Sequence, residues 1–132
     1  MSLYLWIAVG SALGGVSRFA LSSFVANHIG GAFPWGTLLV NVTGSFVIGF
    51  FYTMTAPEGR WMVGNQGRDF FMIGICGGYT TFSSFSLQTL LLAREGDWLR
   101  AGGNIAGSVV LCLFAVWLGH FAAAAFNTTK GA

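Results

Sequence analysis

The sequence has few charged residues, few cysteines and few prolines. Only 8% of its 132 residues are charged, against roughly 25% in an average soluble domain. Hydrophobic residues reach 55%, including 13 Phe and 5 Trp, so polar side chains are too scarce to cover a water-soluble surface. The same composition excludes a disordered chain, because such chains are rich in charge. A formal net charge of +2 gives no reason to expect a nucleic-acid partner.

The two cysteines, Cys76 and Cys112, lie in separate apolar runs. Their spacing indicates neither a disulfide framework nor a metal site. Glycine, in contrast, is abundant: its 20 residues are roughly twice the usual share. Such enrichment is expected where helices pack backbone to backbone, or break, inside lipid.

Four apolar stretches are long enough to cross about 30 Å of hydrocarbon, which takes about 20 helical residues. They cover residues 3–27, 36–56, 70–93 and 102–126. None of the connectors is long enough to be a soluble domain, and the stretches lack the period-two polar pattern of transmembrane strands. We therefore predict an all-α integral membrane protein, with residues 1–132 forming a single transmembrane domain of four helices.

The cations are divided almost evenly between the two membrane faces. With four spans, both termini and the second connector share one face, which carries Arg60, Arg68 and Lys130. The other face carries Arg94 and Arg100, and Arg18, within the first helix, can snorkel the same way. The positive-inside rule then assigns no strong orientation. The chain is hypothesised to insert both ways up and form an antiparallel dimer; the alternative is a single orientation fixed by something the charge count misses.

Polar residues recur at helical spacing in two of the spans. The second span has Thr37, Asn41 and Ser45 on one face, and the fourth has Asn104, Ser108 and Cys112, beside the GxxxG pair Gly103 and Gly107. Such residues either bond neighbouring helices along a small-residue seam or line a water-filled path. Packing is favoured for the fourth span. For the amide of Asn41 both interpretations stay open, because all the hydrogen bonds of a buried amide are harder to satisfy than those of a hydroxyl.

The third span contains a predicted helix break. Gly77 and Gly78 each cost roughly 1 kcal/mol relative to alanine, and Thr80 and Thr81 are good N-cap residues for a new helix. A break at mid-span frees carbonyls at the end of the first half and N–H groups at the start of the second. It thereby favours a cation site beside an anion-favouring helix end.

Beyond the break, Phe82 and Phe85 form one stripe and Ser83 and Ser86 form a neighbouring one. Aromatic stripes are usually packing. A phenyl stripe that lies beside a hydroxyl stripe and next to a helix break is a less common combination than a packing stripe alone.

These motifs resemble those of a known family. Residues 14–19 read GGVSRF, residues 36–41 read GTLLVN followed by GSF at 44–46, and residues 77–86 read GGYTTFSSFS. Together they resemble the small dual-topology fluoride channels of the Fluc (CrcB) family, over nearly the whole chain. The resemblance implies an antiparallel homodimer in the inner cell membrane, with a mid-membrane break in each third helix. It also implies two fluoride pores through which fluoride leaves passively, protecting the cell from its toxicity.

The resemblance also implies roles for individual residues. Phe82 and Phe85 correspond to pore-lining phenylalanines, Asn41 to a pore amide, and Ser83 and Ser86 to a polar track. The carbonyls of Gly77 and Thr80 correspond to ligands of a sodium ion at the dimer centre. Many members have a glutamate where this chain has Gln88, whose amide cannot ionise.

Neutral donors suit fluoride, a small and tightly hydrated anion. Amide N–H groups, hydroxyls and the positive edges of phenyl rings can replace its lost water while still releasing the ion. Arg18 is interpreted as structural or as drawing anions to a vestibule.

Three alternatives are weaker. A proton-coupled four-helix multidrug exporter needs a membrane-embedded carboxylate, whereas all four acidic residues fall in or beside connectors. A structural membrane subunit would carry no ion flux. An enzyme is the weakest interpretation, since His28 and His120 have no acidic or thiol partner at a catalytic spacing.

Overall fold

The computed structural model describes residues 2–129, and over that range the chain is helical and has no strand. The segments in order are α1 (Leu3–Ile29), α2 (Trp35–Met54), α3 (Asn65–Asp69), the π-helix η1 (Phe70–Cys76), α4 (Gly77–Tyr79), α5 (Phe82–Arg94) and α6 (Trp98–Thr128). The segments α3, η1, α4 and α5 follow one another along one rod and together count as one span. With this rod, four helices are long and apolar enough to cross a membrane. This confirms the four predicted spans. The third begins at Asn65 instead of residue 70, and the second ends at Met54 instead of residue 56.

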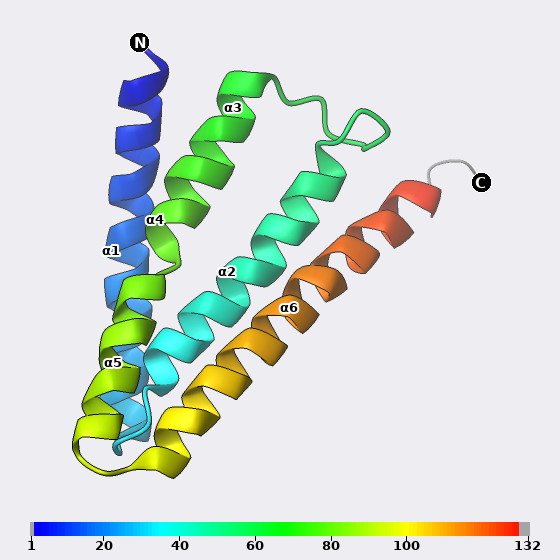
Figure 1. Cartoon of the computed structure of the whole chain (residues 1–132). Helices are drawn as coiled ribbons and strands as arrows, with labels where there is room; N and C mark the ends of the chain where they lie inside the picture. Colours follow the sequence, from blue (N-terminus) through cyan, green and yellow to red (C-terminus); the bar gives the residue numbers. More distant parts are fainter. Residues whose placement is uncertain (1, 130–132) are drawn as a thin grey trace.

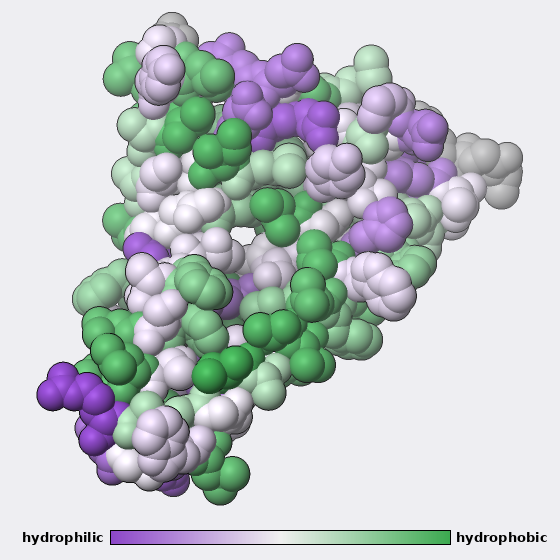
Figure 2. All heavy atoms as spheres, viewed as in Figure 1, coloured by the Kyte–Doolittle hydropathy of each residue, from purple (hydrophilic) through white to green (hydrophobic). Residues whose placement is uncertain are grey.

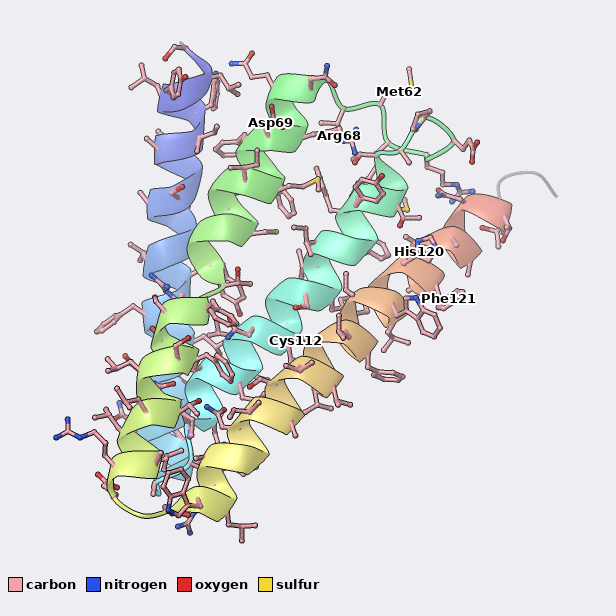
Figure 3. All side chains as sticks on the ribbon, viewed as in Figure 1. Met62, Arg68, Asp69, Cys112, His120 and Phe121 are labelled. Atoms are coloured by element: carbon pink, nitrogen blue, oxygen red, sulfur yellow. The ribbon has the colours of Figure 1, made fainter. Side chains whose placement is uncertain are left out.

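The four rods run antiparallel (Figure 1). The start of α1, the end of α6 and the connector 55–64 lie at one end of the molecule, and the connectors 30–34 and 95–97 lie at the other. Arg68 lies at the first of these ends, beside Asp69 and near Met62 of the connector (Figure 3). The placement agrees with an even number of spans. Lys130, which belongs to the predicted charge count, lies outside the described residues.

Glycine lets the long helices touch backbone to backbone along two seams. Between α2 and α6, the most extensive contact, a Cβ on Gly119 would lie 2.2 Å from the carbonyl oxygen of Phe46. Between α1 and the third span, a Cβ on Gly14 would lie 2.2 Å from the carbonyl oxygen of Ile75. The GxxxG pair singled out in the sequence makes no such contact. Gly107 faces open space, and a Cβ on Gly103 would come no nearer than 4.0 Å to a ring carbon of Phe33.

The surface between the two ends is mainly apolar. In Figure 2 the hydrophilic residues gather toward the two ends, while hydrophobic residues cover most of the spans between them. Large side chains such as Phe19, Leu113 and Trp117 are exposed along the rods. An exposed apolar surface of this extent is typical of helices that face lipid or another membrane helix.

The third span is the irregular one. After η1 and the single turn of α4, Thr80 (φ −81°, ψ 157°) and Thr81 (φ −150°, ψ 109°) are extended, and α5 starts a new helix. The predicted helix break and its N-cap are therefore present, with the Thr81 hydroxyl accepting from Ser84 N–H at 3.1 Å. The glycines do not form the break. Gly77 and Gly78 are helical, and Gly78 instead lets α1 approach, because its Cβ would lie 2.5 Å from the Ser11 carbonyl oxygen.

Candidate functional site

The break is paired with one side chain from the second span. Asn41 on α2 uses both ends of its amide on the backbone of Thr81. Its Oδ1 accepts the Thr81 N–H at 2.7 Å, and its Nδ2 donates to the Thr81 carbonyl at 3.1 Å. This two-point contact fixes which way the amide faces. The second hydrogen on Nδ2 donates no hydrogen bond at the break.

The four carbonyls of residues 77–80 lose their helical donors at the break, and two of those donors bond side chains instead. In a continuous α-helix the N–H of Thr81 would bond the carbonyl of Gly77, and the N–H of Ser84 would bond that of Thr80. Here the first donates to Asn41 Oδ1 and the second to Thr81 Oγ1. The preceding carbonyl, that of Cys76, is in contrast doubly used, by the N–H and the hydroxyl of Thr80, both at 3.0 Å.

A cleft of about 440 Å³ lies beside the break, between α2, the third span and α6. We call it the break cleft. It brings together five of the residues predicted from sequence: Asn41, Gly77, Thr80, Phe82 and Phe85. The rings of Phe82 and Phe85 lie 5.3 Å apart between centroids and are tilted by 49°, and Phe82 is 79% exposed. No acidic or basic side chain lines the break cleft.

The two serines of the predicted polar track lie outside this cleft. Ser83 and Ser86 are both exposed. The Ser83 hydroxyl is 3.3 Å from the Thr81 hydroxyl, and the Ser86 hydroxyl donates to the Phe82 carbonyl at 2.9 Å. Within one chain they are therefore not brought together with Asn41.

A second hollow of about 870 Å³ lies between α1, the connector 30–34, the start of α2, and α5. We call it the arginine cavity, because Arg18 lines it and is its only cation. No hydrogen bond or ion pair joins Arg18 to another residue in the described part of the chain. Gln88 lines the same cavity, and its buried Oε1 has no hydrogen-bond partner. Thr81 borders both hollows, so they approach each other at the break.

Sequence reasoning missed part of this lining. The sequence patterns indicate no role for Ser84, on the arginine cavity, or for Met72 and Cys76, on the break cleft. Ser84 sits between two serines that the stripe pattern did select, so only the three-dimensional path of α5 distinguishes it.

The polar face of α6 packs within the chain. Asn104 is 1% exposed and donates to the Thr89 hydroxyl at 2.9 Å, and Ser108 donates to Asn104 Oδ1 at 3.3 Å. The first bond joins α6 to α5, the second lies within α6, and both support the packing interpretation. Ser108 also lines the break cleft, as does Cys112 at the same spacing.

The remaining ionisable groups form no catalytic set in the described residues. His120 lies 2.8 Å from the Thr53 hydroxyl, and His28 bonds the Phe24 carbonyl of its own helix. Residues 2–129 contain no cluster of three or more His, Cys, Asp or Glu able to hold a metal. At the start of α6, outside the membrane-spanning helices, hydrogen bonds from Arg100 lower the pKa of Asp97.

Fold and site together define a multi-pass helical membrane protein whose third span is interrupted beside an uncharged cleft. Residues 5–120 match the family described as CrcB-like protein, Camphor Resistance (CrcB), and the chain belongs to that family.

Its relatives include three proteins named "Fluoride-specific ion channel FluC". The protein of Opitutus terrae is 70% identical over 131 residues, which cover 99% of each chain. That of Methylocella silvestris is 65% identical over 98% of each chain. That of Paramagnetospirillum magneticum is 58% identical over 96% of this chain and 99% of its own.

Proposed function

We propose that this chain is a fluoride-selective channel that lets fluoride leave the cell passively and so protects it from fluoride toxicity. The observation that carries the proposal is the break cleft, where an amide and two phenyl rings meet at a helix break without a charged side chain. The identity of the ion follows from the relatives, which are named as fluoride channels at up to 70% identity over nearly the full chain.

Within the cleft, the available donors suit a small anion. Asn41 holds its amide against Thr81 and keeps one N–H that its bonds to the break do not use. The edges of Phe82 and Phe85 supply the positive rims of two rings. The first N–H groups of α5 have no helical acceptor and add the positive end of a helix dipole. Several weak neutral donors let the ion enter and also leave. Ser83 and Ser86 extend this path as a polar track.

The arginine cavity serves this path as a vestibule. Arg18 forms no ion pair with Glu95, the acidic residue of the same lining, so its charge is available to raise the local concentration of anions. Gln88 lines the same wall and adds amide hydrogens without a charge. An unpaired cation in a wide cavity attracts an anion without surrounding it, which favours passage over tight binding.

The residues at the break fit a sodium ion. The carbonyls of Gly77 and Thr80 lack their helical donors, and carbonyl oxygen is the ligand type that hard cations prefer. When bound, sodium would supply a fixed positive charge held by backbone oxygens. Two carbonyls per chain are few for such an ion, and two facing breaks related by a two-fold axis would provide four.

The functional unit is an antiparallel homodimer in the inner cell membrane, with the break of each subunit near mid-membrane. Arg60 and Arg68 at one end of the chain are balanced by Arg94 and Arg100 at the other, which supports insertion in both orientations. Labelling of introduced cysteines from both sides of intact vesicles tests this. A single labelled orientation would contradict dual topology.

The direct test of function is fluoride efflux from liposomes that contain the purified protein. We expect fluoride to leave down its gradient without a proton gradient, and chloride to be retained. A structural subunit would give no flux. A proton-coupled exporter would need a proton gradient and would move organic cations.

A further inference from the structure

We propose that Asn41 and Thr81 are positioning residues for the sodium site, because they divert two N–H groups that would otherwise occupy the carbonyls of Gly77 and Thr80. The inference rests on the proposed sodium site and adds the side chains that keep it open. It also connects the cation site to the anion path, since Asn41 lines the break cleft.

The first diversion is made across two helices. Asn41 Oδ1 accepts the Thr81 N–H at 2.7 Å, although Asn41 lies on α2, forty positions earlier in the chain. That N–H is the one that would bond the carbonyl of Gly77 in a continuous helix. Gly77 is exposed and lines the break cleft, so its released carbonyl is at a surface that an ion can reach.

The second diversion is local. The hydroxyl of Thr81, as N-cap of α5, accepts the Ser84 N–H at 3.1 Å. That N–H would otherwise return to the carbonyl of Thr80. The extended ψ of 157° at Thr80 turns this carbonyl away from the axis of α5. The Gly77 carbonyl is thus released by Asn41, and the Thr80 carbonyl by the extended backbone together with the Thr81 cap.

The arrangement implies that the cation and the break stabilise each other. If Asn41 loses its acceptor, the Thr81 N–H can return to the Gly77 carbonyl, and sodium must then displace a hydrogen bond in order to bind. By reciprocity, bound sodium favours the open break and hence the orientation of the Asn41 amide. The loss of one hydrogen bond corresponds to a fall in sodium affinity of about tenfold.

The test measures the sodium dependence of the thermal midpoint of the purified dimer, with the large organic cation N-methylglucamine as the reference. Asn41→Leu removes both bonds to Thr81, whereas Asn41→Asp keeps the acceptor for the Thr81 N–H. We expect the sodium concentration at half-maximal stabilisation to rise about tenfold for Asn41→Leu. It should change by no more than about twofold for Asn41→Asp, even though that variant loses fluoride flux, because its carboxylate repels the anion.

A second pair of variants tests Thr81 independently and decides the matter if Asn41→Leu does not fold. Thr81→Val removes the hydroxyl acceptor at nearly constant shape, and Thr81→Ser restores it. Thr81→Val should weaken the sodium response, and Thr81→Ser should recover it. Asn104→Leu is the matched control, because it removes a buried amide that has two side-chain bonds, contacts no backbone group of the break and does not line the break cleft. It should lower the midpoint equally in both salts.

The outcomes separate this inference from the proposed function. An unchanged sodium response in Asn41→Leu or Thr81→Val, or an equal loss in Asn104→Leu, would overturn the positioning role. A wild-type dimer without any sodium response would overturn it too, while leaving fluoride flux as the test of channel function. Absence of fluoride flux, with the sodium responses as expected, would instead overturn the channel and leave the positioning role standing.

Discussion

The third and fourth spans share several residue types but differ in how regular their helices are. Each contains small residues, hydroxyls and a cysteine, and each is 30 or 31 residues long. The fourth is a continuous helix over Trp98–Thr128. The third contains a π-helix, a short α-helical turn and two extended residues before it becomes helical again at Phe82.

The difference lies in where the polar side chains find their partners. On α6 the amide of Asn104 bonds the hydroxyls of Thr89 and Ser108, so side chains satisfy one another and the backbone stays helical. At the break, Asn41 and Thr81 bond main-chain groups, which takes these groups out of the helix. The same residue types therefore stabilise a helix or interrupt it, according to whether they bond side chains or the main chain.

The largest expected effect concerns the close contact of the third span with α1. Gly78→Ala would place a Cβ 2.5 Å from the Ser11 carbonyl oxygen and 2.8 Å from its Cα. Backbone atoms cannot move aside cheaply, so we expect a loss of about 3 kcal/mol in stability. The measurement is the thermal midpoint and yield of folded protein in detergent.

The matched control lies on the fourth span. Gly107 faces open space, so Gly107→Ala should be neutral or gain up to roughly 1 kcal/mol from helix propensity. Equal destabilisation by both substitutions would contradict the contrast between the spans, and would indicate that the Gly107 face packs against another copy.

The second prediction concerns the phenyl pair beyond the break. Phe82→Ile and Phe85→Ile keep apolar bulk but remove the positive ring edges. Fluoride efflux from liposomes should fall at least about tenfold, equivalent to about 1.4 kcal/mol in the barrier, while the dimer still elutes intact. Phe121→Ile on α6 is the control, since this ring points away from α2 (Figure 3). Unchanged flux in both cleft variants would show that Phe82 and Phe85 serve helix packing alone.

The third prediction concerns the amide of the fourth span. Asn104→Leu removes the acceptor of the Ser108 hydroxyl and the donor to the Thr89 hydroxyl, which keeps its bond to the Phe85 carbonyl. We expect this loss to cost about 1–3 kcal/mol. Flux per folded protein should stay near the wild-type value, because this amide lies in the contact with α5. Efflux normalised to folded protein, measured beside the thermal midpoint, checks both parts. Loss of flux at full stability would instead assign Asn104 to the ion path.

The smallest effect is expected at the start of α6. Arg100 lowers the pKa of Asp97 in the folded chain, so the charge of Asp97 contributes stability above the ordinary carboxyl pKa. That contribution is lost as the pH falls through the lowered folded-state value. Asp97→Asn keeps an N-cap acceptor but should abolish this pH-dependent part. The thermal midpoint of the variant should then change less than that of the wild type between neutral pH and about pH 3. An equally steep decline in the variant would place the pH dependence elsewhere.

Much of the site could be predicted from short-range patterns. The lengths of the apolar stretches predicted four spans, because the hydrocarbon thickness sets a minimum helix length. Thr80 and Thr81 predicted the break, since N-capping depends on neighbouring residues alone. The contact of Phe82 with Phe85 followed from their spacing of three on a helix.

The glycine seams show where this reasoning fails. The GxxxG spacing of Gly103 and Gly107 suggested a packing face, yet these glycines meet no helix within the chain. Gly14 and Gly119 make the close approaches instead. Spacing shows that a helix face is narrow enough for a close contact. It does not show which neighbouring helix lies opposite, because that depends on how the helices pack together.

The sequence by itself determined the membrane location, the four spans and the helix break, because each depends on local composition or on residues within one turn. The tertiary structure alone decided that Asn41 meets Thr81, that Ser83 and Ser86 lie outside the break cleft, and that Arg18 shares a cavity with Gln88. A side chain can free a carbonyl on another helix only when packing brings the two helices into contact, and contacts between residues forty positions apart follow from the packing of the whole chain.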